Sequence, residues 1–326
     1  MKKIKILFCD NPQYKTTKHI LKHWQENHEV RTDPYFDPVK AEWADVIYVE
    51  WCEGTMIEAS KGKGHYEGVI SDNQPISQTD FDWSGKKIIN RCIDIDAYYG
   101  HYRQVKWENV SDLIFIAKHI QQMVDKEMNF KEKYPNLKVH HIPISVDLNA
   151  WTFKDKTKTH GKNIAFVHHL WTGKGIPLAL QIIKKLVDID KEWKLHIVGN
   201  WSNEAWLPAY VKHFVKDLNL QENVIFYGRV NDLDKFLDNM DYVLTSSHKE
   251  AFSLITAESM AKGIKPIIHN WEGAKDIWGT KWVWNTIDEA ITLFLNDYNS
   301  NEYREFVSRY DKKYEIEALD KILLNI

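Results

Sequence analysis

Short, continuous apolar segments alternate with amphipathic segments along the 326 residues of this chain, and this alternation limits the possible folds more than any other feature. Continuous apolar strands are typical of parallel sheets that are covered on both faces. The amphipathic segments have the spacing of helices that cover a sheet, and they lie at 15–27, 118–128, 176–188 and 204–218. The predicted strands form two series, at 4–8, 46–49, 87–89, 113–116 and 141–144, and then at 163–167, 195–199, 224–227, 242–245, 266–269 and 282–284. We therefore predict an α/β protein with two doubly wound, Rossmann-like domains.

A polar stretch separates the two series of predicted strands. Between Asp147 and Lys162 the chain has neither helical nor strand periodicity, and it contains Lys, Thr, Asp and Gly in place of apolar residues. We place the domain boundary near residue 152. The two predicted domains are therefore 1–152 and 153–305.

Composition narrows the class of protein. Hydrophobic residues make up 44% of the chain and charged residues 27%, which is typical of a folded globular protein. The apolar run near the amino terminus ends within a few residues, too early for a secretory or membrane-spanning segment, so we expect a cytoplasmic protein without a transmembrane segment. Cys9, Cys52 and Cys92 lack Cys-x-x-Cys spacing, which indicates buried thiols and argues against a zinc site or a disulfide framework.

Glu250 and Glu258 lie on either side of a predicted helix start. The apolar strand 242–245 precedes it, and apolar residues recur at helical spacing over 251–262. Backbone N–H groups at a helix start have no partner within the helix, so they attract phosphate. Glu250 lies just before the turn and Glu258 about two turns into the helix, so one carboxylate can bind sugar hydroxyls and the other a ribose diol. The segment predicts a site for an anionic, polyhydroxylated ligand.

This segment resembles the Glu-x7-Glu signature of retaining glycosyltransferases of the family 4 type. The family pattern of Ser, then Glu-Gly/Ala-Phe-Gly, then Glu-Ala-Met-Ala and Gly is similar to Ser246, Glu250-Ala251-Phe252-Ser253, Glu258-Ser259-Met260-Ala261 and Gly263. Ser253 stands where the family has glycine. The resemblance implies the GT-B architecture, in which two Rossmann-like domains face a cleft and a final segment, here 306–326, returns to the N-terminal domain.

A second stretch, 166–175, resembles the family's Gly-Arg-Leu, three residues, Lys-Gly, whose cations neutralise the leaving diphosphate. Lys174 and Gly175 match this pattern, whereas His169 stands where the family has arginine. The resemblance implies catalytic roles for Glu250, Lys174 and His169, and a ribose contact for Glu258. The other donor-binding residues that it implies are Phe252, Ser253, Leu254, Asn200, Arg229 and Val230.

The N-terminal domain is expected to bind the acceptor. Trp51 follows the predicted strand 46–49, and Arg91 and Asp96 follow the strand 87–89. Open α/β sheets bind ligands at the carboxyl ends of their strands, so these three residues are candidates for the acceptor side. Structural ion pairing is an equally good explanation of Arg91 and Asp96.

The resemblance implies transfer of a hexosyl-type sugar from a UDP- or GDP-sugar donor to a hydroxyl group, with retention of configuration. The acceptor would be a glycan, a lipid-linked molecule or another alcohol, and neither a metal nor a tightly bound cofactor is expected. Two alternatives share the fold and stay open: a sugar-nucleotide epimerase, and a protein that binds sugar nucleotides without turnover. The net charge of −3 weighs against a nucleic acid acceptor.

Overall fold

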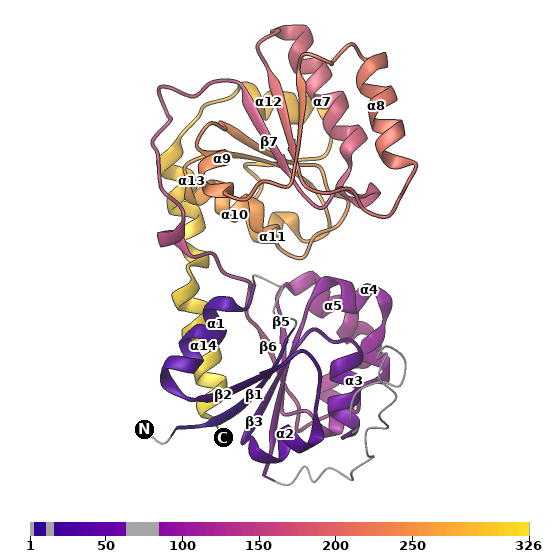
Figure 1. The fold of residues 1–326 in the computed structure, drawn as a ribbon, viewed down its shortest axis with the longest axis vertical. Helices are drawn as coiled ribbons and strands as arrows, with labels where there is room; N and C mark the ends of the chain where they lie inside the picture. Colours follow the sequence, from indigo (N-terminus) through magenta and orange to yellow (C-terminus); the bar gives the residue numbers. More distant parts are fainter. Residues whose placement is uncertain (1–2, 11–15, 63–84, 326) are drawn as a thin grey trace. The chain divides into compact units, whose positions relative to one another are not determined.

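The computed structural model describes residues 3–10, 16–62 and 85–325, without the side chains of 94–96 (Figure 1). The chain forms two compact units. Unit 1 contains Met1–Ser145 and Lys312–Ile326, and unit 2 contains Val146–Asp311. Each described unit is built around a parallel sheet with helices on both faces, so the prediction of two Rossmann-like α/β domains is confirmed.

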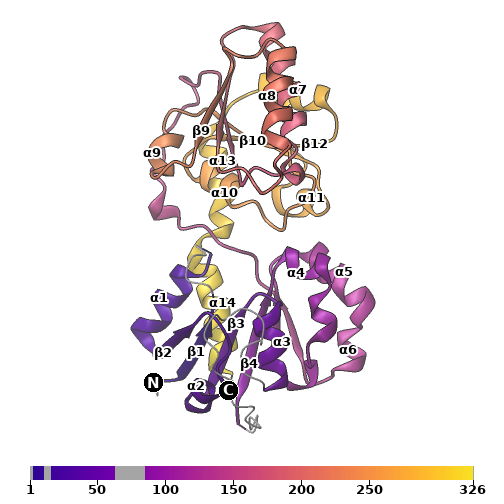
Figure 2. The same ribbon diagram turned by 45° about the vertical axis from the view of Figure 1, so that its right-hand side comes forward.

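The sheet of unit 1 has the strand order β2-β1-β3-β4-β5-β6. Its strands are β1 (Lys5–Cys9), β2 (Glu29–Asp33), β3 (Val46–Glu50), β4 (Lys87–Cys92), β5 (Asp112–Phe115) and β6 (Lys138–His141). The helices α1 (Lys18–Asn27) and α14 (Lys312–Leu324) lie together on one face (Figures 1 and 2). The remaining helices of unit 1 are α2 (Pro38–Trp43), α3 (Gly54–Lys61), α4 (Asp94–Tyr99), α5 (Lys118–Met128) and α6 (Phe130–Lys133).

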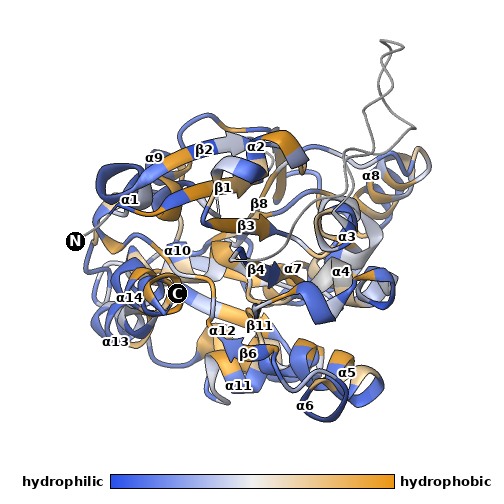
Figure 3. Ribbon diagram, turned by 90° about the horizontal axis from the view of Figure 1, so that it is seen from below, coloured by the Kyte–Doolittle hydropathy of each residue, from blue (hydrophilic) through white to orange (hydrophobic). Residues whose placement is uncertain are grey.

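Two strands of unit 1 differ from the sequence prediction. β2 was not predicted, because its sequence Glu-Val-Arg-Thr-Asp is polar and mostly exposed at the sheet edge. By contrast, β1 and β3 are apolar, as Figure 3 shows, and both were predicted from their apolar sequences. β6 lies at Lys138–His141 and not at 141–144, because the apolar Ile142 and Ile144 lie beyond the strand end and are buried there as an irregular segment.

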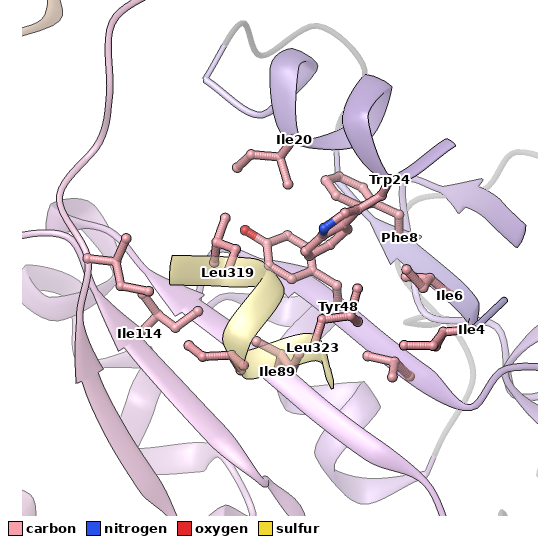
Figure 4. Close-up of a cluster of buried hydrophobic side chains, with 13 residues drawn as sticks. Ile4, Ile6, Phe8, Ile20, Trp24, Tyr48, Ile89, Ile114, Leu319 and Leu323 are labelled. Atoms are coloured by element: carbon pink, nitrogen blue, oxygen red, sulfur yellow. The ribbon is translucent and has the colours of Figure 1, made fainter. Parts of the chain in front are cut away.

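An aromatic cluster forms the centre of the described core of unit 1 (Figure 4). The ring of Phe8 on β1 stacks on Tyr48 of β3 at 4.7 Å, and Trp24 of α1 meets both rings edge-on at 5.8 and 5.2 Å. Leu319 and Leu323 of α14 pack on this cluster. The last helix of the chain is therefore an integral part of the unit 1 core, although 166 residues of unit 2 precede it.

The sheet of unit 2 has the order β12-β11-β10-β7-β8-β9. Its strands are β7 (Asn163–Val167), β8 (Lys194–Val198), β9 (Val224–Gly228), β10 (Tyr242–Thr245), β11 (Lys265–His269) and β12 (Val283–Trp284). One face carries α7 (Ile176–Ile189), α8 (Leu207–Asp217) and α12 (Ile287–Leu295) (Figure 1). The other elements are α9 (Leu233–Leu237), α10 (Leu254–Ala261), α11 (Ala274–Trp278), α13 (Ser300–Val307) and a short 3-10 helix, η5 (Ser308–Tyr310).

The polar stretch near the expected boundary packs against unit 2. Lys156 donates from its Nζ to the carbonyls of Asp238 and Met240, at 2.9 and 2.5 Å, and its backbone N–H donates to Ser300. The compact units separate at Ser145 and Val146, a few residues before residue 152, because the N–H of Val146 donates to the carbonyl of Tyr310 and the guanidinium of Arg304 donates to the carbonyl of Leu148. Among the described helices, none combines the length and the apolar character that a membrane span requires.

Candidate functional site

Parallel strand pairing brings Lys174 and Glu250 together at one edge of the unit 2 sheet. β7 and β10 are neighbours, and the loops after their carboxyl ends carry these two residues. Lys174 Nζ lies 2.5 Å from Glu250 Oε1, although the residues are 76 positions apart. Their side chains are 17% and 14% exposed, so the pair is accessible to solvent without being a surface ion pair. The carboxyl edge of such a sheet is where open α/β proteins bind ligands.

Hydrogen bonds to backbone carbonyl groups hold the loop after β7 and the loop after β10 together. Ser246 donates from Oγ to the carbonyls of Lys174 and Gly175 at 3.0 and 2.9 Å, and the N–H of His248 donates to the carbonyl of Gly173. Gly175 has a φ of +67°, and a Cβ there would lie 2.1 Å from the carbonyl oxygen of Ser246. Glycine is therefore required at this position, both for the left-handed backbone and for the close approach of the loops.

The helix start after β10 lies at Leu254 and not at 251, as α10 is shorter than predicted. Ser253 is its N-cap and has a φ of 72°, which is the left-handed region that favours glycine. The hydroxyl of Thr256 holds this turn, since it lies 2.9 Å from Ser253 Oγ and 3.1 Å from Thr245 Oγ1. The first N–H groups of α10 have no partner one turn earlier in the helix, and the turn is strained because a residue with a side chain, Ser253, adopts a left-handed φ.

The other donor-side candidates lie at several points around this helix start. Phe252 is buried, so its main chain but not its ring can face a ligand, and Leu254 is half-buried at the first helical position. Glu258 is half-buried about one turn into α10, whereas the sequence predicted about two turns. Glu250 and Glu258 thus lie in the same strand-loop-helix segment, on opposite sides of the strained turn at Ser253.

The loop after β8 joins the loop after β7. The N–H of Leu170 donates to the carbonyl of Asn200 at 2.8 Å, and Thr172 donates to the carboxylate of Glu204 from its N–H and its hydroxyl. Gly199 has a φ of +134°, and a Cβ there would meet the carbonyl oxygen of His168 at 1.7 Å. These contacts place Asn200 beside the loop that carries Lys174. Arg229 and Val230 follow β9, the edge strand, which β8 separates from β7.

Two adjacent histidines follow β7, and they differ in their surroundings. His169, the candidate that replaces arginine, is exposed. His168, which the sequence analysis missed, is partly buried and its ring meets Phe166 edge-on at 4.7 Å. Burial lowers the pKa of His168 well below its usual value, and the charge of Lys174 lowers it further, although a hydrogen bond with the main chain of Leu244 acts in the opposite direction. His168 is therefore a neutral imidazole next to Lys174 at neutral pH.

The acceptor-side candidates belong to unit 1. The Arg91 side chain is fully buried, and its guanidinium is 3.0 Å from Glu50 and 2.5 Å from Glu315 of α14. This is the structural ion pairing that was the alternative explanation. Trp51 is half-buried directly after β3, and its carbonyl accepts a hydrogen bond from Asn90 at 2.8 Å. The side chain of Asp96 lies outside the described part of the chain.

The described residues contain no group of three or more His, Cys, Asp or Glu side chains arranged to hold a metal ion. The three cysteines are buried thiols, each near the carboxyl end of a unit 1 strand. Burial raises the pKa of the Cys9 thiol far above its usual value, so this group is an inert thiol and not a nucleophile.

Comparison with known proteins agrees with this geometry. Residues 149–310 match the family model described as glycosyl transferases group 1. A stretch of 142 residues is 28% identical to an uncharacterized glycosyltransferase of Haemophilus influenzae, covering 43% of this chain and 38% of that protein. This chain therefore spans less than half the length of that relative.

Solved structures with the same fold have low sequence identity. Anabaena HepE in complex with UDP is 13% identical with a TM-score of 0.72, and the match covers 100% of both chains. The lipopolysaccharide outer core galactosyltransferase WaaB in its apo form is 12% identical with a TM-score of 0.66, and the match covers 99% of both chains. Both similarities extend over the two units, so they identify the GT-B fold. Residues 149–310 thus match the model of group 1 glycosyl transferases, in a chain whose two Rossmann-like units have the GT-B fold.

Proposed function

We propose that this protein is a retaining, metal-independent glycosyltransferase that moves a hexosyl-type sugar from a nucleoside diphosphate sugar to an acceptor hydroxyl. The observation that carries the proposal is the pairing of Lys174 with Glu250 at 2.5 Å, next to the strained helix start at Ser253. A cation, outward-facing N–H groups and a carboxylate are the groups that a diphosphate and a sugar ring require. The structural neighbour HepE is known in complexes with UDP and with UDP-glucose, which favours a UDP-sugar over a GDP-sugar as the donor.

In the proposed reaction the bond between the anomeric carbon and the diphosphate breaks, the acceptor oxygen bonds to that carbon, and the proton of the acceptor hydroxyl passes to the departing diphosphate. Negative charge then grows on the diphosphate, where Lys174, His169 and the N–H groups of Phe252 to Leu254 would stabilise it. Glu250 would bind the hydroxyls of the donor sugar and Glu258 those of the ribose. Asn200, Arg229 and Val230 would contact the nucleotide from the ends of β8 and β9.

We assign the donor to unit 2 and the acceptor to unit 1. The acceptor would be a hydroxyl of a glycan or of a lipid-linked molecule, and Trp51 and Asp96 are the proposed contacts. Arg91 would act only indirectly, because its side chain is fully buried between Glu50 and Glu315. It would support the end of β4, from which Asp96 follows.

Donor binding is tested by thermal shift with UDP, GDP and their common sugar conjugates, each added to the full chain without and with EDTA. A cognate nucleotide at about 100 times its Kd adds roughly 2.7 kcal/mol of stability. The proposal predicts a shift for one base only, with no loss on chelation. A chain that no nucleoside diphosphate stabilises would contradict the proposed function.

Turnover is tested with the cognate donor and a panel of oligosaccharide and lipid-linked acceptors, with the anomeric configuration of the product read by NMR. Retention is the expected outcome. Slow hydrolysis of the donor by wild-type protein, lost in Glu250→Gln, would exclude a protein that only binds. Conversion of the donor to its epimer without an acceptor would instead indicate an epimerase.

A further inference from the structure

The two passages of the chain between the units are bonded to one another on the unit 2 side. The first passage enters unit 2 at Val146 and the second leaves it at Asp311. The N–H of Val146 donates to the carbonyl of Tyr310 at 2.8 Å, and Val146 and Asp311 form a short parallel bridge. Val146 is 3% exposed, so these bonds are not solvated surface contacts. Any change in the course of one passage must therefore move the other, and with it Tyr310.

Tyr310 is also part of an aromatic cluster beneath the candidate donor loop. Its ring meets Phe252 edge-on at 5.0 Å and Trp278 of α11 at 5.8 Å, and its hydroxyl donates to the carbonyl of Ile277 at 2.8 Å. Trp278 is fully buried and donates from Nε1 to the carbonyl of Phe252 at 3.1 Å. Phe252 directly precedes the strained Ser253, so the cluster holds the peptide that opens α10.

A second contact joins the first passage to the other end of α10. The guanidinium of Arg304 donates to the carbonyl of Ala261, the last residue of α10, at 2.5 Å. It also donates to the carbonyl of Leu148, two residues after Val146, at 3.0 Å. The start of α10 is therefore linked to the passages through Phe252 and Tyr310, and its end is linked to Leu148 through Arg304. Contacts of this kind can transmit a displacement because packed interiors resist compression.

We propose that Tyr310 is a positioning residue that couples the inter-unit passages to the donor loop, so that a nucleoside diphosphate bound at the start of α10 and the passage at Val146 influence one another. This inference rests on the proposed function for the identity of the ligand. The link between Tyr310 and the loop does not depend on it. Coupling between two sites is reciprocal, so the nucleotide must stabilise the passage if the passage holds the loop.

The link is tested first without ligand, by amide hydrogen exchange of the full chain. The N–H groups of Thr256 and Ala257 both donate to the carbonyl of Ser253, so their exchange reports opening of the turn. Tyr310→Leu removes the ring contacts and is expected to speed their exchange about tenfold, whereas Tyr310→Phe keeps the ring and is expected to behave like the wild type. The control is Tyr303→Leu, because Tyr303 of α13 is fully buried, whereas Tyr310 is half-buried, and its ring packs on Tyr298 and Trp282 instead.

The control separates positioning from general destabilisation. If Tyr303→Leu speeds the exchange of Thr256 and Ala257 as much as Tyr310→Leu does at the same loss of Tm, Tyr310 has no special role and the inference fails. It fails equally if Tyr310→Leu leaves both amides as in the wild type. Rescue by phenylalanine would locate the effect in the ring and not in the hydroxyl.

The reciprocal effect is tested with UDP or GDP, whichever the thermal shift selects. Saturating nucleotide should slow the exchange of the Val146 amide in the wild type by several-fold, and leave the remote amide of Val224 unchanged. The protection should vanish in Tyr310→Leu. Wild-type protein that binds nucleotide without any change at Val146 would overturn the coupling, even if the variant does not fold. If neither nucleotide binds, the proposed function fails and the ligand-free exchange still decides the link.

Discussion

Each of the two sheets has charged residues at the carboxyl ends of its two central strands, but these residues are buried in unit 1 and partly exposed in unit 2. In unit 1, Glu50 is the last residue of β3 and Arg91 the last but one of β4, and both are fully buried and closed off by Glu315 of α14. In unit 2, the loops after β7 and β10 carry Lys174 and Glu250, which keep 17% and 14% of their side-chain surface exposed. The same fold thus places charges at the carboxyl edge twice, and the element that covers the edge determines whether they are sealed in the interior or stay accessible to solvent.

The difference has a physical basis. Both partners of a buried ion pair have lost their hydration. Removing either partner therefore leaves an uncompensated buried charge and destabilises the fold. A half-buried ion pair in a loop keeps part of its hydration. Each group of such a pair can therefore give up its partner and bind a ligand of opposite charge instead. α14 supplies the cover in unit 1, whereas the loops of unit 2 leave the pair accessible.

The largest expected effect is a loss of stability when the buried ion pairs of Arg91 in unit 1 are removed. Arg91→Met should destabilise the protein by about 3–5 kcal/mol at pH 8, because it leaves two buried carboxylates without a cation. Denaturant unfolding measures this loss. The control is Arg103→Met, because the ion pair of Arg103 with Glu127 is exposed on both sides and its loss should change stability far less. Equal effects of the two substitutions would show that burial does not distinguish them.

The next effect concerns the unit 2 pair. Glu250→Gln should lower the rate of sugar transfer by about 10²–10³-fold, because a neutral amide neither holds the donor hydroxyls as strongly nor offsets positive charge in the transition state. Stability should change little, since the site is partly solvated. Steady-state kinetics and Tm are measured together, with the exposed Glu222→Gln as the control. Full activity of the Glu250→Gln variant would remove this residue from the mechanism.

A smaller effect tests how closely the loops of unit 2 must approach. Gly175→Ala should cost about 2–3 kcal/mol, since the new Cβ meets the carbonyl of Ser246 at 2.1 Å and φ is +67°. Gly228→Ala has a similar φ of +64° with nothing within 4 Å of the new Cβ, and should cost only about 1 kcal/mol. The two unfolding curves give the difference. A similar cost at both positions would mean that backbone conformation alone, and not contact, explains the glycine at 175.

The smallest effect concerns the pH dependence of the buried cluster in unit 1. Burial raises the pKa of Glu50 from 4.5 to about 7, against the opposing influence of Arg91 and Tyr48. Between these values the native state binds one more proton than the unfolded state, so the contribution of this group to stability falls as pH rises from about 4.5 to 7. The slope is at most about 1.4 kcal/mol per pH unit. Glu50→Gln should flatten the Tm profile in that window, and an unchanged profile would contradict the raised pKa.

The sequence predicted the strands that have continuous apolar character. The range predicted for β10, 242–245, equals Tyr242–Thr245, and β7 was predicted at its observed bounds, because both strands are buried in the middle of a parallel sheet. The polar edge strand β2 has no such signal and was missed. Hydrophobic patterning finds strands that are rich in apolar residues, including the mostly exposed edge strand β9, and it overlooks a polar edge strand such as β2.

The candidate site was only partly readable from the sequence. Lys174 and Glu250 were selected from separate motifs, and their contact depends on the pairing of β7 with β10. His168 was overlooked in favour of its exposed neighbour His169, since adjacent residues at a strand end point to opposite sides. Tyr310 lies far from both motifs and carries no local pattern of its own.

By itself, the sequence determined that the chain forms two parallel α/β sheets, and which loops carry the charged and glycine residues of the candidate site. These properties follow from local burial patterns and turn chemistry, which a few neighbouring residues encode. The tertiary structure alone decided that Arg91 is sealed by Glu315, that Lys174 meets Glu250, and that Tyr310 touches Phe252. Each of these contacts joins segments that lie far apart in the sequence, and side-chain environments of that kind depend on how strands and helices pack.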